Sequence, residues 1–315
     1  MPEEIIHQKH RLSSFQIIIS GFVGVILLGA LLLMLPVSTT EGCITPFNET
    51  LFTATSAVCV TGLVVQDTGS YWSGFGQAVI LALIQIGGLG VTSIGAGVIL
   101  AMGRKLDLKG RRLIREASNL DSNKGIVRFI KSVLLTTFII EFTGAVLSFF
   151  VFIQDYPLQK AIGISLFHSV AAFNNSGFDI LGNLQNLIPY QNNIMLNLVT
   201  CGLIFFGGIG FLVIREMWQY RLSFRKYSMH AKVVLSVSGV LIIVGTLLLK
   251  LTENVTWLGA FFHSVSARTA GFSTYPLGTF SNAGLLVLTA LMFIGASPGS
   301  TGGCLLYTSP SPRDG

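Results

Sequence analysis

Long apolar stretches alternate with short polar segments along this chain of 315 residues. Residues 15–36 form the first stretch, and its length matches the roughly 20 apolar residues that a membrane-spanning helix needs. The same criterion predicts further helices of this kind at 77–102, 126–153, 194–214, 233–251 and, beginning the last one, 285–296. The pattern therefore predicts an all-α polytopic membrane protein.

Three short segments between these helices repeat one sequence pattern. They cover residues 52–63, 167–178 and 262–272, and the third is one residue shorter than the others. Each begins at a phenylalanine, continues with helix-compatible residues, and ends on a glycine followed by an apolar residue. An apolar run of about a dozen residues is too short to cross a membrane at ~1.5 Å per residue. Each segment is therefore predicted to be a re-entrant helix that crosses only halfway.

The repeat divides the chain into units, each made of a spanning helix, a re-entrant helix with its loop, and a second spanning helix. The predicted segments are, in order, a cytoplasmic lead at 1–14, the first unit at 15–102, a basic cytoplasmic loop at 103–125, the second unit at 126–214, a second basic loop at 215–232, an incomplete third unit at 233–303 and a tail at 304–315.

Composition and charge agree with this organisation. Half of the residues are hydrophobic (51%) and only 11% are charged, which excludes an ordinary soluble domain. Of the 20 Lys and Arg residues, two lie in the lead, nine between Arg104 and Lys131, and five between Arg215 and Lys232. Because Lys and Arg mark the cytoplasmic side, the N-terminus is predicted to be cytoplasmic. The four cysteines lack metal-ligand spacing, which argues against a zinc site.

Gly62, Gly177 and Gly271 close the three short segments. A helix that ends at membrane depth points the negative end of its dipole at the following loop, which favours a cation there. The loop can then turn carbonyl oxygens toward one axis, where they replace the hydration shell of the ion. Glycine permits the backbone angles that this turn requires. Ordinary helix C-caps are the alternative interpretation, and three glycines in matched contexts favour the cation site.

Four segments give the chain a resemblance to a known family. They are FTATSAVCVTGL at 52–63, AFNNSGF at 172–178, SARTAGF at 266–272 and FIGASPGSTGG at 293–303. These segments resemble the Trk/Ktr/HKT superfamily of potassium transporters, and within it the KtrB-type membrane subunits, over residues 15–303. The resemblance implies repeated helix–pore loop–helix units around a single pseudo-fourfold pore, with three of the four units present in this chain.

The same resemblance assigns roles to individual residues. The implied ion-selectivity filter consists of Cys59, Val60, Thr61, Gly62, Asn174, Asn175, Ser176, Gly177, Arg268, Thr269, Ala270 and Gly271. The implied intramembrane gating loop consists of Gly295, Ala296, Ser297, Pro298, Gly299, Ser300, Thr301, Gly302 and Gly303.

The resemblance further implies potassium uptake through this carbonyl-lined filter, at the plasma membrane of a bacterium, by a protein that is not an enzyme. The implied partners are a second copy in a homodimer, a cytoplasmic KtrA-like nucleotide-binding ring and the lipid bilayer, and no nucleic acid. Nucleotide would act only through the partner subunit, K⁺ is the transported ion, and coupling to Na⁺ stays open. The alternatives are a non-conducting membrane receptor or scaffold, or an inactive fragment of the transporter.

Five side chains near the loops carry their own expectations. Glu141 lies midway along a spanning helix, where an acid either attracts ions or forms a pairing that sets the pore geometry, or else is a buried acid held by neighbouring hydroxyls or by Arg268. A cation beside a K⁺ path would repel the ion, so Arg268 is expected to point behind the filter and brace its loop. His168 and His263 are expected to anchor their helices by hydrogen bonds, rather than bind metal or sense pH. The thiol of Cys59 is expected to pack behind the filter.

Four further segments complete the expectations. The tail at 304–315 is similar to the translation of a sequencing adapter, and we expect it to be an artefact joined to a truncated gene. The glycine-rich segment 87–97, like 295–303, lacks the G-K-[ST] ending of a phosphate-binding loop, which predicts helix packing or hinging. The charged segments 103–124 and 215–232 are suited to anionic lipid or to a cytoplasmic partner.

Overall fold

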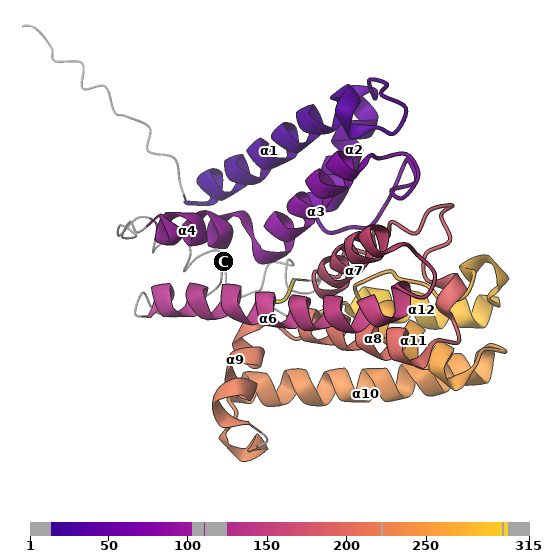
Figure 1. Ribbon diagram of the computed structural model, residues 1–315. Helices are drawn as coiled ribbons and strands as arrows, with labels where there is room; N and C mark the ends of the chain where they lie inside the picture. The colour runs from indigo at the N-terminus through magenta and orange to yellow at the C-terminus, as the bar shows by residue number, and fades with distance from the viewer. Residues whose placement is uncertain (1–13, 103–109, 111–124, 222, 298, 302–315) are drawn as a thin grey trace, which may run out of the picture.

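The computed structural model describes residues 14–102, 110, 125–221, 223–297 and 299–301. Within this part of the chain there are helices and loops, one isolated bridge between Thr39 and Trp72, and no β-strand (Figure 1). The α-helices are α1 (Ser14–Leu33), α2 (Phe47–Val58), α3 (Gly74–Leu89), α4 (Val91–Ala101), α6 (Ile126–Phe152), α7 (Leu158–Phe173), α8 (Ile194–Gly208), α9 (Phe211–Tyr220), α10 (Met229–Thr252), α11 (Trp257–Ser266) and α12 (Asn282–Ile294). Most of the first basic loop and the whole 304–315 tail lie outside the described residues.

The chain is a multi-helix membrane protein. The helices α1, α6 and α10 are long and apolar enough to cross a membrane, and two bent helix pairs raise the count to five if each pair is one crossing. α12 has 13 residues and is shorter than a crossing helix. The prediction of a spanning helix is therefore met at 15–36, 126–153 and 233–251, whereas the segment from 285 onward forms only this shorter helix.

The side chains of α6 show how the membrane environment sorts its two faces. In the middle of the helix its buried face includes Thr137, Glu141, Gly144 and Ser148, spaced three or four residues apart, while apolar residues are buried toward both ends. Large apolar side chains cover the opposite face, among them Phe138, which is 65% exposed. Polar and small residues thus pack against other helices while apolar residues face outward, the arrangement that a lipid surround favours.

The two spanning segments predicted at 77–102 and 194–214 are each a bent pair of helices, and the first bend lies in the segment 87–97 for which packing or hinging is predicted. The axes of α3 and α4 meet at 102°, and those of α8 and α9 meet at 104°. The residue at each bend is a glycine, Gly90 with φ +81° and Gly210 with φ +90°. Because L-residues rarely adopt this left-handed backbone, glycine ends one helix there and the chain leaves in a new direction.

The glycines that precede each bend have a second role. A methyl carbon at Gly87 would lie 2.0 Å from the carbonyl oxygen of Val58, the last residue of α2. The equivalent carbon at Gly207 would lie 1.8 Å from the carbonyl oxygen of Phe173, the last residue of α7. Each bent helix thus presses its backbone onto the end of a short helix, and only glycine allows this approach.

The short helices α2, α7 and α11 each lie beside the helices that precede and follow them in the chain (Figure 1). α2 packs against α1 and α3, α7 against α6 and α8, and α11 against α10, α12 and α8. A continuous core joins these packings, and its fully buried side chains include Phe152, Phe173, Phe178 and Phe262. The C-terminal ends of the three short helices are therefore held in one region of the interior.

Candidate functional site

Three loops follow the short helices and are named here by position: loop 1 (59–62), loop 2 (174–177) and loop 3 (268–271). Each loop folds back onto its own helix through a backbone hydrogen bond that spans five residues. The three bonds run from Thr61 N to Ser56 O at 2.9 Å, from Ser176 N to Ala171 O at 2.9 Å, and from Gly271 N to Ser266 O at 3.1 Å. Loops 1 and 2 therefore share one turn geometry, in which the residue before the glycine donates, whereas in loop 3 the glycine itself donates.

Left-handed backbone occurs at matched positions in these loops. Gly62, Gly177 and Gly271 have φ values of +79°, +72° and +75°. Two residues earlier, Val60 and Asn175 also have positive φ, at +55° and +57°. A β-branched residue in this region is strained, and sequence reasoning did not anticipate it. Loop 3, which comes from the shorter copy of the repeat, has positive φ only at its glycine.

The loops lie side by side in a fixed order. A methyl carbon added at Gly62 would lie 2.4 Å from the carbonyl oxygen of Ser176 in loop 2. A methyl carbon added at Gly177 would lie 2.4 Å from the carbonyl oxygen of Ala270 in loop 3. Gly62 and Gly177 thus each contact the carbonyl that precedes the glycine of the next loop. Successive segments arranged around one axis would make contacts of this kind.

Loop 2 occupies the middle position and is the most buried of the three. Asn174, Asn175 and Ser176 are each at most 1% exposed. Loop 1, in contrast, exposes Cys59, a free cysteine, and the packing of its thiol behind the loop stays a prediction. Gly271 of loop 3 is also exposed, and no described atom outside its chain neighbours lies within 4 Å of its Cβ position.

Glu141 supports loop 2 from behind. Its carboxylate accepts hydrogen bonds from Gln85 Nε2 at 3.1 Å and from Asn174 Nδ2 at 3.2 Å, and that amide also donates to Gln85 Oε1 at 2.8 Å. The acid is buried, as one of the two interpretations expects. Its partners are amides of α3 and loop 2 rather than hydroxyls or Arg268, so that part of the expectation is wrong. Gln85 was missed because it is 56 residues away in sequence.

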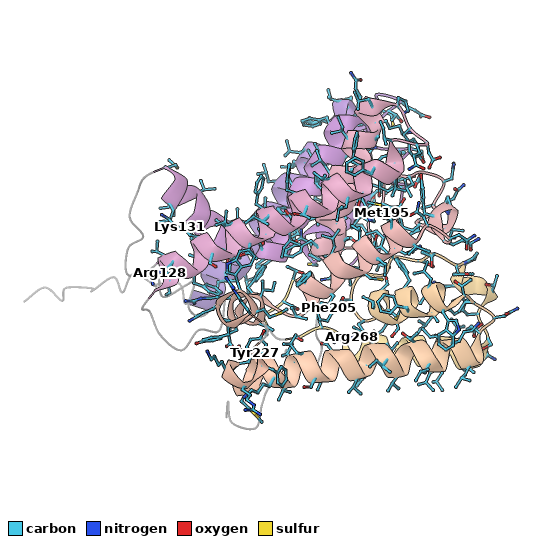
Figure 2. The ribbon with its side chains drawn as sticks, turned by 60° about the horizontal axis from the view of Figure 1, so that its bottom comes forward. Arg128, Lys131, Met195, Phe205, Tyr227 and Arg268 are labelled. Carbon is cyan, nitrogen blue, oxygen red and sulfur yellow. The ribbon has the colours of Figure 1, made fainter. Side chains whose placement is uncertain are left out.

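Arg268 braces the chain behind loop 3. Its Nη2 donates to the carbonyl oxygen of Gly295 at 3.1 Å, and its side chain shares a small cavity with Phe205 and Ala296 (Figure 2). The guanidinium therefore ties loop 3 to the end of α12. This contact agrees with the expectation that Arg268 points away from the loop axis.

The two equivalent histidines differ. His168 Nε2 lies 2.8 Å from Thr200 Oγ1, whose hydroxyl donates to the Leu196 carbonyl at 2.7 Å, so the ring donates to the threonine. His168 thus anchors α7 to α8, as expected. The Nε2 atom of His263 is buried without a hydrogen-bond partner among the described residues, so its expected anchor is not formed through that atom. No group of metal-ligating side chains occurs in the described part of the chain.

The segment after α12 lies against loop 2 and the α8–α9 bend. Its backbone amides at Ser297 and Thr301 donate to the carbonyls of Gly208 at 3.1 Å and Gly207 at 3.2 Å. The Thr301 hydroxyl lies 3.0 Å from the Phe173 carbonyl oxygen and 3.1 Å from the Asn175 amide. The predicted gating segment therefore contacts the buried loop directly. Its residues 298, 302 and 303 lie outside the described part.

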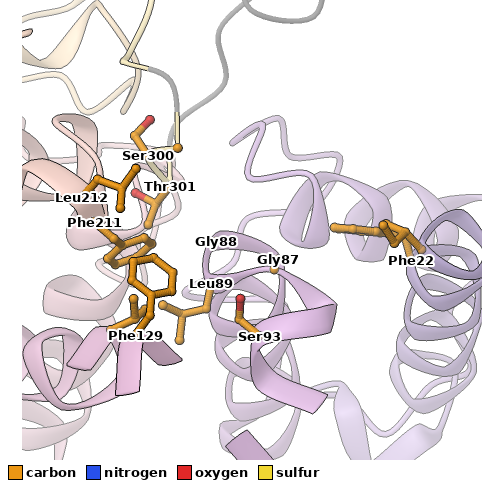
Figure 3. A pocket seen from close by; sticks show the side chains of 14 residues that line it. Phe22, Gly87, Gly88, Leu89, Ser93, Phe129, Phe211, Leu212, Ser300 and Thr301 are labelled. Atoms are coloured by element: carbon orange, nitrogen blue, oxygen red, sulfur yellow. The ribbon is translucent and has the colours of Figure 1, made fainter. Parts of the chain in front are cut away.

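A cavity of about 260 Å³ opens beside this contact (Figure 3). Thr301 and Gly299 line it on one side, and Phe129 and Phe211 line it from α6 and α9. The glycine turn of α3, including Gly88, completes the wall. An ion that leaves the three loops on this side would enter a space bordered by the segment after α12.

An acidic pair lies at the other end of the loops. Burial, aided by the negative charge of Asp67, raises the pKa of the Asp179 carboxyl to about 6, although the Leu181 backbone amide donates to it at 3.1 Å. The Asp67 carboxylate accepts the backbone N–H of Asn183 at 2.9 Å. Asp179 follows loop 2 by two residues, so the charge beside this loop depends on pH near neutrality.

The chain is similar to known cation transporters over most of its length. The TrkH family model, described as cation transport protein, matches residues 7–238 and 233–308. The potassium/sodium uptake protein NtpJ of Enterococcus hirae is 39% identical over 312 residues, covering 96% of this chain and 68% of the relative. The Ktr system potassium uptake protein B of Vibrio alginolyticus is 36% identical, covering 91% of this chain and 65% of the relative.

A solved structure agrees with the fold. The crystal structure of the potassium transporter TrkH from Vibrio parahaemolyticus superposes with a TM-score of 0.64 at 18% identity, covering 94% of this chain and 60% of that one. This likeness concerns the fold alone. The chain spans about two thirds of the length of the curated relatives, and less of the solved structure.

Proposed function

The chain belongs to the TrkH family of cation transport proteins, and we propose that it takes up potassium ions through the pore that loops 1, 2 and 3 surround. The observation that carries this proposal is the contact between loops, in which Gly62 touches Ser176 O and Gly177 touches Ala270 O. Three backbone turns, each closed by a hydrogen bond that spans five residues, meet here at the ends of three short helices. The relatives named for potassium and sodium uptake support the choice of ion.

Backbone carbonyls would provide the selectivity. The negative ends of α2, α7 and α11 point at the loops and favour a cation, and carbonyl oxygens replace its hydration shell. The proposed filter residues are those of the three loops, and side chains contribute little to the ion path because Asn174 and Arg268 bind behind it. Potassium would be preferred over sodium, while sodium coupling is not part of the proposal.

A filter that surrounds an ion needs contact on every side. Loop 2 has neighbours on both sides, but loops 1 and 3 each keep an exposed face, at Cys59 and at Gly271. We infer that a further segment of the whole protein, outside the described residues, packs against both faces. The proposed pore is thus pseudo-fourfold, with one unit each at 15–102, 126–214 and 233–303.

The segment at residues 295–303 is the proposed gate. Thr301 bonds to the backbone that leads into loop 2 and also lines the cavity of about 260 Å³ next to it. Movement of this segment would change both the width of the path and the support of the filter. The proposal places the N-terminus in the cytoplasm and the protein in a bacterial plasma membrane, as a homodimer on a nucleotide-binding ring.

Ion uptake by living cells tests the proposal. The full-length protein is expressed in a bacterial host that lacks its own potassium uptake, and growth is followed across a range of external K⁺ concentrations. Growth at low K⁺ that depends on the protein is the expected result. No rescue at any K⁺ concentration, with the protein present in the membrane, would contradict transport and favour a non-conducting receptor or scaffold.

A further inference from the structure

A groove between α6 and α9 is not used by the pore. Because the chain turns by 104° at the bend, α8 leaves α6 and α9 runs across its end (Figure 1). The groove between them has a volume of about 450 Å³, which falls within the range of about 300–1,000 Å³ that small-molecule sites occupy. Its lining comes from α6, from α9 and from Phe206 of α8.

One end of the groove is apolar. Leu135, Ile139 and Ile140 form its floor on consecutive turns of α6, and Phe206 and Met217 form its walls. Leu135 is 61% exposed and Ile139 is 41% exposed, so both belong to the outward, apolar face of α6 that a lipid surround favours. Such a surface is suited to a hydrocarbon chain that lies along α6, because apolar side chains predominate there and Thr136 is the polar residue of α6 among them.

The other end of the groove is polar and basic. Arg215 of α9 lies there with the hydroxyl-bearing residues Ser132 and Thr136 of α6. Within the described residues Arg215 is exposed and has neither a hydrogen bond nor an ion pair, and its neighbour Glu216 already accepts the backbone N–H of Ser228 at 2.8 Å. The lining contains no acidic residue.

Further cations and an aromatic ring surround this polar end. Arg128 and Lys131 are exposed on the first turns of α6, at the same end of the helix (Figure 2). Trp218, which is 75% exposed, lines the groove beside Arg215. Exposed tryptophan together with Lys and Arg is typical of the level of lipid headgroups. The groove thus runs from headgroup chemistry to acyl-chain chemistry over two turns of one helix.

We propose that this groove binds one anionic phospholipid, with its phosphate at Arg215 and an acyl chain along Leu135 and Ile139. The cationic end without a competing acid supplies charge complementarity to the phosphate. The lipid would fill the space that the bend opens and would hold α9 against α6. The first residues of α9 line the cavity beside the loops. Lipid that holds α9 in place would therefore also stabilise the wall of the cavity that α9 forms.

Lipid retention by the purified full-length protein tests the proposal independently of transport. The protein is transferred to detergent containing phosphatidylglycerol or phosphatidylcholine, and native mass spectrometry counts the lipids that stay bound. We expect one phosphatidylglycerol molecule to be retained at concentrations at which phosphatidylcholine is lost. Equal retention of the two lipids would overturn the role of charge.

Two pairs of variants locate the site. Arg215→Gln should weaken retention of phosphatidylglycerol about fivefold, which corresponds to one basic residue near an anionic lipid. Its matched control is Arg225→Gln, an exposed arginine outside the groove lining, which should retain lipid like the wild type. Leu135→Trp should fill the groove and abolish retention, whereas Leu147→Trp, on the same helix outside the groove, should not.

Three outcomes would overturn the proposal. Equal lipid retention in all four variants would place the lipid elsewhere on the surface. A Leu135→Trp variant whose measured mass falls from dimer to monomer while lipid retention persists would assign the groove to contact between copies. Loss in both control variants as well as in Arg215→Gln would show unspecific binding to the basic surface.

Discussion

Gly177 is the position at which the pore proposal can be tested most sharply. In Gly177→Ala the new methyl carbon would lie 2.4 Å from the backbone carbonyl oxygen of Ala270, and backbone cannot yield as a flexible side chain can. The residue also has φ +72°, where a left-handed backbone costs an L-residue about 1–2 kcal/mol. That strain alone corresponds to a factor of about 5–30 in an equilibrium between two states.

The expected result is a filter displaced at the point where loops 2 and 3 meet. Uptake of K⁺ and of Na⁺ is measured in proteoliposomes of equal protein content, and the ratio of the two rates gives the selectivity. We expect Gly177→Ala to reduce the K⁺ preference about tenfold while the protein keeps its elution volume and helical content. Gly62→Ala should act similarly, because its methyl carbon would lie 2.4 Å from Ser176 O.

Gly163→Ala is the matched control, in the helix α7 that precedes loop 2. No atom outside the local backbone lies within 4 Å of its Cβ position, and alanine is favoured over glycine in a helix by about 1 kcal/mol. The control should keep the selectivity and unfold at an equal or higher temperature. A Gly177→Ala protein with the wild-type ratio of K⁺ to Na⁺ uptake would refute the assignment of loop 2 to the ion path.

Four further variants test the surroundings of the loops. Glu141→Gln places an NH₂ group against a donor amide and should lower the stability by about 1–3 kcal/mol, seen as a lower melting temperature. Arg268→Gln removes the bond to the end of α12 and should reduce yield or selectivity, and wild-type values of both would refute the brace. Thr301→Val removes the hydroxyl that bonds to loop 2 and should raise basal K⁺ uptake in the absence of partner subunits, whereas lower or unchanged uptake would contradict the gate. Because burial raises the pKa of Asp179 to about 6, its protonation as the pH falls from 7 to 5 should stabilise the fold and weaken K⁺ uptake at low concentration, and Asp179→Asn should flatten both pH profiles.

The hydrophobic pattern predicted the helices well and the bends poorly. α6 (Ile126–Phe152) and α10 (Met229–Thr252) lie where the apolar runs placed them. The glycine-rich segment 87–97 predicted packing or hinging, in agreement with the bend at Gly90, whereas the bend at Gly210 was missed because the apolar run continues across it and hydropathy alone contains no signal of a change in direction. The glycine clusters before them were visible, and their close packing on the ends of α2 and α7 could have indicated a break.

Contacts over long sequence separations were the part that could not be predicted. The three loop glycines were identified because the repeat places them in equivalent contexts. The partners of Glu141 come from α3 and from loop 2, and no local pattern connects them. The difference between His168 and His263 is also tertiary, since only α8 offers a hydroxyl, that of Thr200, at the right place.

The two consecutive asparagines of loop 2 give that loop a role that the repeat does not imply. Asn174 bonds backward to Glu141 of α6, while the amide of Asn175 lies 3.1 Å from the hydroxyl of Thr301 in the segment after α12. The equivalent residues of loop 1 are Cys59 and Val60, which make no such side-chain bonds among the described residues. Loop 2 is thus joined at once to Glu141 and to the proposed gate, whereas loop 3 contacts the gate through Arg268 and Gly295, so displacement of the gate would act on the filter through these two loops.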